Sequence, residues 1–90
     1  MSEKNFAKAL GVTLRTTRRL RGFKVISVHK ELGFSENSIT SWEHGKHLPT
    51  LAKLYALSRL YRVRLSTIMD NTEKAMVLME KGKTNEDRED

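Results

Sequence analysis

Apolar side chains recur every three or four residues along almost the whole chain, which is the spacing of one face of an α-helix. No stretch of useful length alternates between apolar and polar residues as a half-buried strand would. Glycine, proline or a short polar turn separates the periodic segments. The pattern therefore predicts an all-α fold, with helices over about 6–21, 25–32, 36–44, 49–60 and 63–69.

Local signals mark several helix ends. Gly33 closes the second segment, where a left-handed turn residue is wanted, and Ser35 is a good N-cap for the third. Pro49 is the only proline, and we expect it at the first position of the fourth helix. Residues 72–81 predict a further short sixth helix ending at Gly82. The expected organisation is a folded domain over 1–70, an additional helix over 71–82 and a disordered acidic tail over 83–90.

Charge separates the expected domain from the expected tail. Residues 1–70 hold 13 Lys and Arg and 5 acids, whereas residues 71–90 hold 4 and 6, within a chain of net charge +6. A basic domain of this size most often binds nucleic acid. The longest apolar run, Ala75 to Met79, is too short for a membrane span, so we expect a soluble, cytoplasmic protein without membrane contact.

Composition also limits the chemistry. A chain of 90 residues without cysteine predicts neither a large catalytic fold, nor a disulfide scaffold, nor a cysteine-ligated zinc finger. The pair His44 and His47 lacks a third ligand at a suitable distance, so no metal or other cofactor is expected. No nucleophile and base can be paired in the expected domain, and we expect no enzymatic activity.

The most informative segment is the pair of short helices joined by Gly33, Phe34 and Ser35. On the second of them, Ile39 and Trp42 lie three residues apart and are expected to face the core. That placement leaves short polar side chains for the opposite side. A helix with such a face fits the major groove of B-DNA, where base edges present distinguishable donors and acceptors.

From about Leu10 to Met69 the chain resembles the phage-repressor and Cro type of helix-turn-helix protein, also called the xenobiotic-response-element family. The resemblance implies a compact five-helix, lambda-repressor-like domain whose third helix binds the DNA major groove. Its marks, in order, are Leu10-Gly11, Leu14-Arg15, Arg18, Gly22-Phe23, Leu32-Gly33-Phe34-Ser35, Ile39, Trp42-Glu43, Gly45, Pro49, Leu51, Leu54, Val63 and Leu65.

The resemblance also implies which residues contact DNA. Asn37 can pair with adenine, Glu36 can accept from cytosine, and Thr40 can meet a thymine methyl. The alternatives are a helix-dipole partner for Glu36 and a solvated polar face for the others. The expected base contacts are Glu36, Asn37, Thr40 and Ser41. The expected phosphate contacts, each of which could instead serve only solubility, are Arg15, Arg19, Lys24, Ser38, His44 and Lys46.

Other positions concern structure and departures from the family. Arg18 and Glu43 fall where the family has a partly buried ion pair. Lys24, Val25 and Ile26 replace the usual polar cap and Gln at the start of the second helix, and their packing is left open. Two further departures are His29, at a position that is commonly Ala, and Arg62, at a turn that commonly has Gly or Asn.

The leading interpretation is a bacterial or phage transcriptional repressor that binds a palindromic operator as a homodimer. One alternative is an antitoxin that neutralises a partner enzyme through its C-terminal segment and represses its own operon. Another is a protein-interaction module without DNA binding. Candidate dimer residues, which could equally complete the monomer core, are Tyr61, Met69, Met76, Leu78 and Met79.

Overall fold

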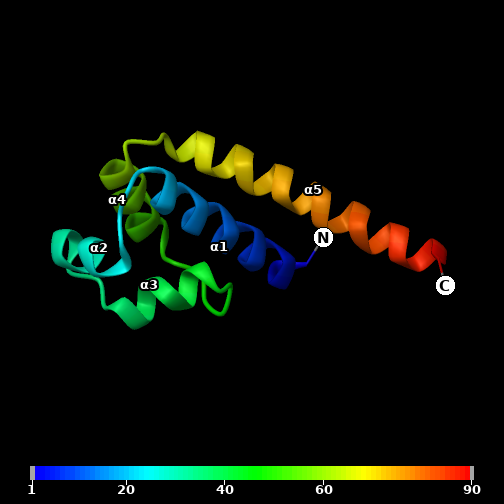
Figure 1. The fold of residues 1–90 in the computed structure, drawn as a ribbon, viewed down its shortest axis with the longest axis horizontal. Coiled ribbons are helices and arrows are strands. Elements are labelled where there is room, and N and C mark those ends of the chain that lie inside the picture. The colour runs from blue at the N-terminus through cyan, green and yellow to red at the C-terminus, as the bar shows by residue number, and fades with distance from the viewer. Residues whose placement is uncertain (1, 90) are drawn as a thin grey trace.

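A computed structural model describes residues 2–89 and the side chains of residues 2–81. Figure 1 shows α5 running alongside α1 and extending beyond it, whereas α2, α3 and α4 lie toward the end remote from both termini. The all-α, five-helix prediction is confirmed for the described residues. The helices are α1 (Glu3–Leu20), α2 (Val25–Leu32), α3 (Glu36–Glu43), α4 (Leu51–Tyr61) and α5 (Leu65–Glu89).

The helix α1 is central because two of its sides are covered, one by α3 and one by α5. It begins at Ser2, whose hydroxyl accepts the backbone N–H of Asn5 at 3.1 Å. Arg18 and Arg19 lie in its last turn, where positive charge complements the helix dipole. The core that α1 shares with the other helices contains Leu10, Leu14, Val28, Ile39, Trp42, Leu54, Leu57, Tyr61 and Ile68.

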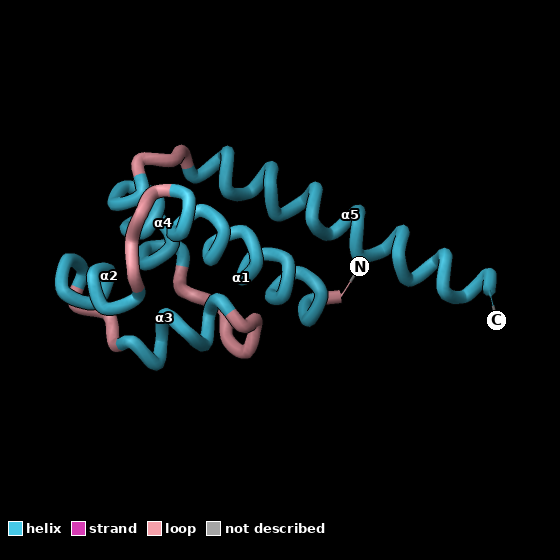
Figure 2. The backbone as a smooth tube through the Cα atoms, viewed as in Figure 1, coloured by secondary structure: helices cyan, strands magenta, loops and turns pink. Residues whose placement is uncertain are grey.

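The connection between α2 and α3 is short, whereas the one between α3 and α4 is longer (Figure 2). Gly33 ends α2 with φ of 78°, a conformation that side chains with a Cβ resist. Ser35 then caps α3 by accepting the N–H of Ser38 at 3.0 Å. Both local signals predicted from the sequence are therefore confirmed.

The start of α4 differs from the expectation. Thr50 is the N-cap and accepts the N–H of Lys53 at 3.2 Å, so Pro49 precedes the cap and is not the first helical residue. The Thr50 hydroxyl satisfies an otherwise unpaired N–H, which proline at the first position cannot do. At the other end, Arg62 adopts the left-handed conformation with φ of 58° that this turn requires.

The expected sixth helix is the continuation of α5. Neither glycine nor proline lies between Leu65 and Lys81, so nothing interrupts the helical hydrogen bonding. Thr72 is fully buried, and its hydroxyl donates to the carbonyl of Ile68 at 2.7 Å. The acidic tail falls in a stretch whose side chains lie outside the described residues, so its disorder stays a prediction.

Two of the five candidate dimer residues are core residues of the monomer. Tyr61 is 1% exposed and packs against Phe23 with ring centroids 5.6 Å apart, and burial raises its pKa above the ordinary range. Met76 is also buried. Burial therefore favours the alternative that Tyr61, from α4, and Met76, from α5, complete the monomer core. Leu78 is exposed, and Met69 and Met79 are half-buried.

Candidate nucleic-acid interface

The inner side of α3 packs against the core of the domain. Ile39 and Trp42 are buried in the shared core, and Phe34 packs edge-on against Trp42 with ring centroids 5.5 Å apart. The Nζ of Lys53, from α4, lies 5.9 Å from the centre of the Trp42 ring. These contacts determine which side of α3 faces solvent.

The outer side of α3 carries the predicted base-contact residues. Glu36, Asn37 and Thr40 are exposed, and Ser41 is half-buried. All four side chains are polar and carry hydrogen-bonding groups. The structure therefore brings these four residues together on one accessible surface.

An ion pair joins the C-terminal end of α3 to α1. The Nε of Arg18 donates to Glu43 Oε2 at 2.7 Å, and Nη2 donates to Oε1 at 2.9 Å. The remaining nitrogen, Nη1, donates to the carbonyl of Phe23 at 2.9 Å. Both side chains are buried, and the hydrogen bonds to Glu43 raise the pKa of Arg18. Because every charged atom is paired, the contact holds α3 in one position relative to α1.

Close backbone contact between α1 and α3 accompanies the ion pair. A Cβ on Gly11 would lie 2.5 Å from the carbonyl oxygen of Glu43 and 2.7 Å from that of Trp42. Real Cβ atoms do not approach backbone oxygens that closely. The absence of a side chain at Gly11 therefore sets how near α3 sits to α1.

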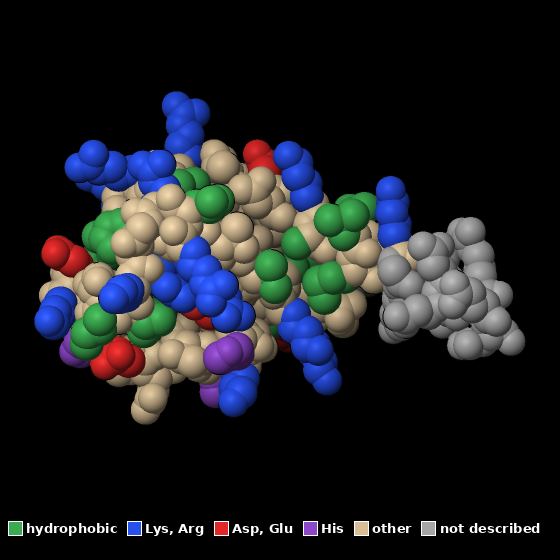
Figure 3. All heavy atoms as spheres, in the orientation of Figure 1, with side chains coloured by type: hydrophobic (Ala, Val, Ile, Leu, Met, Phe, Trp, Pro, Cys, Tyr) green, Lys and Arg blue, Asp and Glu red, His purple; other side chains and the backbone are tan. Residues whose placement is uncertain are grey.

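The predicted phosphate-contact residues surround α3 on three elements. Arg15 and Arg19 are exposed on α1, Lys24 is exposed at the start of α2, and His44 and Lys46 are exposed just beyond α3. Ser38 is half-buried, and its hydroxyl accepts a hydrogen bond from Ser35 at 2.8 Å. Figure 3 shows Lys and Arg side chains spread over this face of the molecule, with histidines at its lower edge.

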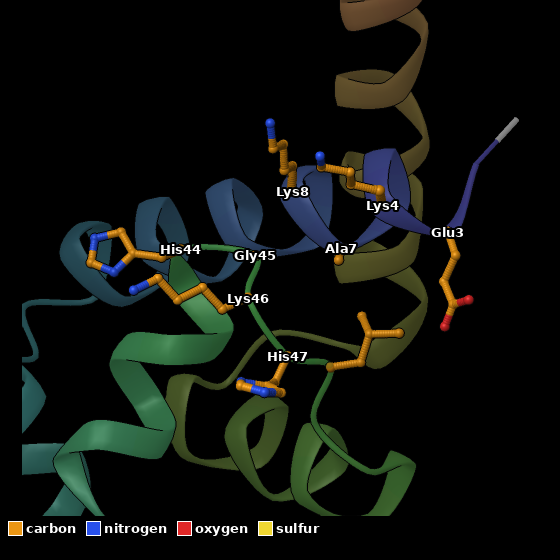
Figure 4. Close-up of a pocket in the computed structure, with 9 residues that line it drawn as sticks. Glu3, Lys4, Ala7, Lys8, His44, Gly45, Lys46 and His47 are labelled. Atoms are coloured by element: carbon orange, nitrogen blue, oxygen red, sulfur yellow. The ribbon is translucent and has the colours of Figure 1, made fainter.

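Two basic residues were missed by the sequence reasoning. Lys4 and Lys8 are exposed on the first turns of α1 and line a cleft with His44, Lys46 and His47. Figure 4 shows the side chains of His44, Lys46 and His47 extending to one side of the loop that follows α3, whereas the side chain of Glu3 points away from them. The cleft is therefore predominantly basic.

The same lysines extend a stripe along α1. Successive residues of an α-helix are about 100° apart around its axis. By this measure, four exposed cations beside the α3-facing side of α1 fall within an arc of about 60° of the helix surface. This basic stripe consists of Lys4, Lys8, Arg15 and Arg19. Its helical spacing was visible in the sequence, but only the position of α3 shows which neighbour the stripe adjoins.

The departures at α2 have simple structural outcomes. Lys24 occupies the N-cap without a side-chain hydrogen bond to the helix. Val25 packs against the core, whereas Ile26 is 39% exposed. His29 pairs its Nδ1 with the carbonyl of Phe34 at 2.7 Å, bridging the turn between α2 and α3.

Comparison with known families agrees with this geometry. A tight pair of helices, with the second one exposing a polar face, defines a helix-turn-helix protein. A helix-turn-helix domain model matches residues 9–67, most of the chain, and the chain belongs to that family. It is accordingly a DNA-binding domain. No curated protein sequence matches it.

Two kinds of feature are absent from the described residues. None of the described helices combines the length and apolar character that crossing a membrane requires. Within the same residues, no three histidine or acidic side chains cluster as they would around a metal ion.

Proposed function

We propose that this protein is a sequence-specific transcriptional regulator that binds double-stranded DNA with α3 in the major groove. The observation that carries the proposal is the outward face of α3, where Glu36, Asn37 and Thr40 are exposed on a helix whose other side is buried. An amide, a carboxylate and a hydroxyl with a methyl group suit adenine, cytosine and thymine edges respectively. Ser41 completes the base-contacting set.

Phosphate contacts supply the affinity in this proposal. The basic stripe on α1 adjoins α3, so it reaches backbone phosphates beside the groove that α3 occupies. Lys24, His44 and Lys46 contribute further contacts from α2 and the loop after α3, and Ser38 contributes its hydroxyl. Lys4 and Lys8 enlarge the set inferred from the sequence. Such contacts make binding strongly dependent on salt.

The operator is proposed to be palindromic and the protein a homodimeric repressor in the bacterial cytoplasm. An eight-residue helix reaches only a few base pairs, so useful specificity requires two copies on half-sites about 34 Å apart. An apolar groove between α1 and α5, with Leu20 and Leu78 79% and 70% exposed, supports a self-contact there. Met69 and Met79 are the other remaining candidates.

The same groove favours a second candidate function. A different protein bound at Leu20 and Leu78 would make the chain an antitoxin that neutralises a partner enzyme and represses its own operon. Light scattering after size exclusion separates the candidates. A dimer of this chain alone supports the homodimeric repressor, and a complex with the product of a neighbouring toxin gene favours the antitoxin.

Selection of bound duplexes from a random DNA pool tests the proposed function. We expect a palindrome whose half-sites are one helical turn apart, or a multiple of it. The log of the affinity should fall with the log of the salt concentration, and Lys46→Ala should reduce that slope by about 0.9. Arg64→Ala removes an exposed charge at the start of α5 and serves as the matched control. Binding without any preferred sequence would contradict the proposal.

A further inference from the structure

One base-contacting candidate on α3 is hydrogen-bonded to a titratable group. The Oγ of Ser41 lies 2.6 Å from Nδ1 of His47, which belongs to the loop after α3. Ser41 is half-buried and His47 is exposed. Both line a hollow beside the outward face of α3, together with Asn37 and Ser38. The ring of His47 therefore restricts the orientation of a hydroxyl on the DNA-facing surface.

The direction of this hydrogen bond depends on the state of the ring. A serine hydroxyl has one hydrogen and two lone pairs, whereas an imidazole nitrogen either accepts or donates according to its protonation. When the neutral ring of His47 carries its proton on Nε2, Nδ1 has none and Ser41 must donate its only hydrogen to it. A neutral ring with its proton on Nδ1 would instead donate to Ser41. When the ring is protonated, Nδ1 can only donate, and the hydrogen of Ser41 is free to point elsewhere.

The two arrangements read different base edges. When the Ser41 hydroxyl donates its hydrogen to His47, it can only accept a hydrogen bond from a base, so it matches the amino groups of adenine or cytosine. A hydroxyl that accepts from His47 can donate to O6 or N7 of guanine or to O4 of thymine. Histidine is the side chain that ordinarily changes charge between pH 5 and 8.

We propose that His47 is a positioning residue that sets the hydrogen-bonding direction of Ser41, that its neutral ring keeps the proton on Nε2, and that the base preferred opposite Ser41 consequently changes with pH. This inference rests on the proposed function, because it requires Ser41 to face a base pair. Acidification favours a base that presents an acceptor, and alkaline conditions favour a base that presents an amino group.

Other ionisable groups lie near His47, and one of them, His44, provides a control substitution. His44 lines the same basic cleft and is also exposed, but Ser41 is hydrogen-bonded to His47 and not to His44 among the described contacts. His44→Ala therefore removes a neighbouring imidazole without touching the Ser41 hydroxyl. The charged or titratable groups that share the cleft with His47 are Glu3, Lys4, Lys8, His44 and Lys46.

The test compares base preference at two pH values. Duplexes from the selection are varied at the base pair whose preference Ser41→Ala relaxes, and binding is measured by fluorescence anisotropy at pH 5.5 and 8.0. We expect the affinity ratio of acceptor-presenting to amino-presenting bases to rise at pH 5.5, by about three- to tenfold, the worth of one hydrogen bond. The protein with His44→Ala should keep this change in ratio.

Two substitutions of His47 separate positioning from mere structural support. His47→Asn retains a hydrogen-bonding side chain that does not titrate, so it should bind DNA yet give the same ratio at both pH values. His47→Ala should also abolish the pH dependence while remaining folded by circular dichroism.

The outcomes distinguish this inference from the proposed function. An unchanged ratio in the unsubstituted protein, a pH-dependent ratio that survives His47→Asn, or a Ser41→Ala variant with unaltered preference would overturn the role of His47 and leave the proposed function standing. Failure to prefer any duplex at either pH would overturn both.

Discussion

The helices α2 and α3 have the same length, eight residues, but they are held in very different ways. The first turn of α3 is capped by Ser35, and its last residue, Glu43, forms the buried ion pair with Arg18. The N-cap of α2 is Lys24, which makes no side-chain hydrogen bond to the helix, and Val28 is its only buried residue.

The difference matches the demands of reading DNA. Side chains that meet base edges must be held within a fraction of an ångström, which requires a helix whose position is determined at both ends. By contrast, α2 packs mainly against α3 and needs only to support it. Among the described residues, the buried ion pair lies on α3, the helix that carries the proposed base contacts.

Removing the anchor of α3 should have the largest effect. Arg18→Ala leaves Glu43 buried without a partner, and we expect a loss of about 3–5 kcal/mol in the free energy of unfolding. Urea denaturation followed by circular dichroism measures this loss. The neighbouring exposed residue provides a control, since Arg19→Ala should change stability by less than about 0.5 kcal/mol. Equal effects of the two substitutions would show that the ion pair does not anchor α3.

Separating α3 from α1 should have the next largest effect. Gly11→Ala places a methyl group against backbone oxygens of α3, and we expect destabilisation of about 1–3 kcal/mol. The sign is informative, because alanine in a helix ordinarily gains about 1 kcal/mol over glycine. Thr16→Ala, on an exposed part of α1, should not destabilise. A stabilised Gly11→Ala variant would contradict the close approach of the two helices.

The two helices should also differ in how they contribute to binding. Asn37→Ala on α3 should weaken discrimination at one base pair by about 1–3 kcal/mol and leave other positions unchanged. Lys24→Ala at the start of α2 should weaken binding to all duplexes alike and reduce the salt slope. Competition binding with single-base operator variants measures both effects. Equal losses for Asn37→Ala on specific and random DNA would remove Asn37 from the base contacts.

Substitutions that remove the cap of α3 or add a cap to α2 should have the smallest effects. Ser35→Ala should cost about 1 kcal/mol, because the N–H of Ser38 loses its acceptor. Lys24→Ser should give α2 a side-chain cap and raise stability by about 0.5–1 kcal/mol. Thermal denaturation of the two variants and the double variant provides the measurement. No gain from Lys24→Ser would show that the start of α2 is limited by something other than its missing cap.

Much of this architecture could be predicted from short stretches of sequence. Gly33 marks the end of α2 and Ser35 the start of α3. Both positions could be predicted, because a left-handed turn and an N-cap depend only on residues within four positions. The same locality misled at Pro49, which was expected at the first helical position, because Thr50 caps α4 one residue later by accepting the N–H of Lys53. It also suggested a break before Thr72 that the uninterrupted helix does not have.

The candidate site was predictable only in part. Ile39 and Trp42 indicated which side of α3 is buried, and that left the polar residues of the other side for DNA. The place of Lys4 and Lys8 in the basic cleft could not be predicted from the sequence, because it depends on the loop after α3 lying against the start of α1. The contact between Ser41 and His47 likewise requires that loop to turn back beside the helix.

Neighbouring residues were enough to establish that the chain is helical, where α2 and α3 meet, and which side of α3 remains polar, because helical periodicity, caps and left-handed turns are properties of short segments. Long-range packing was needed to show that Tyr61 and Met76 are buried, that Gly11 lies against the backbone of α3, and that His47 is hydrogen-bonded to Ser41. Burial and close approach depend on which distant segments share a surface, and α5 covering α1 is a contact between opposite ends of the chain.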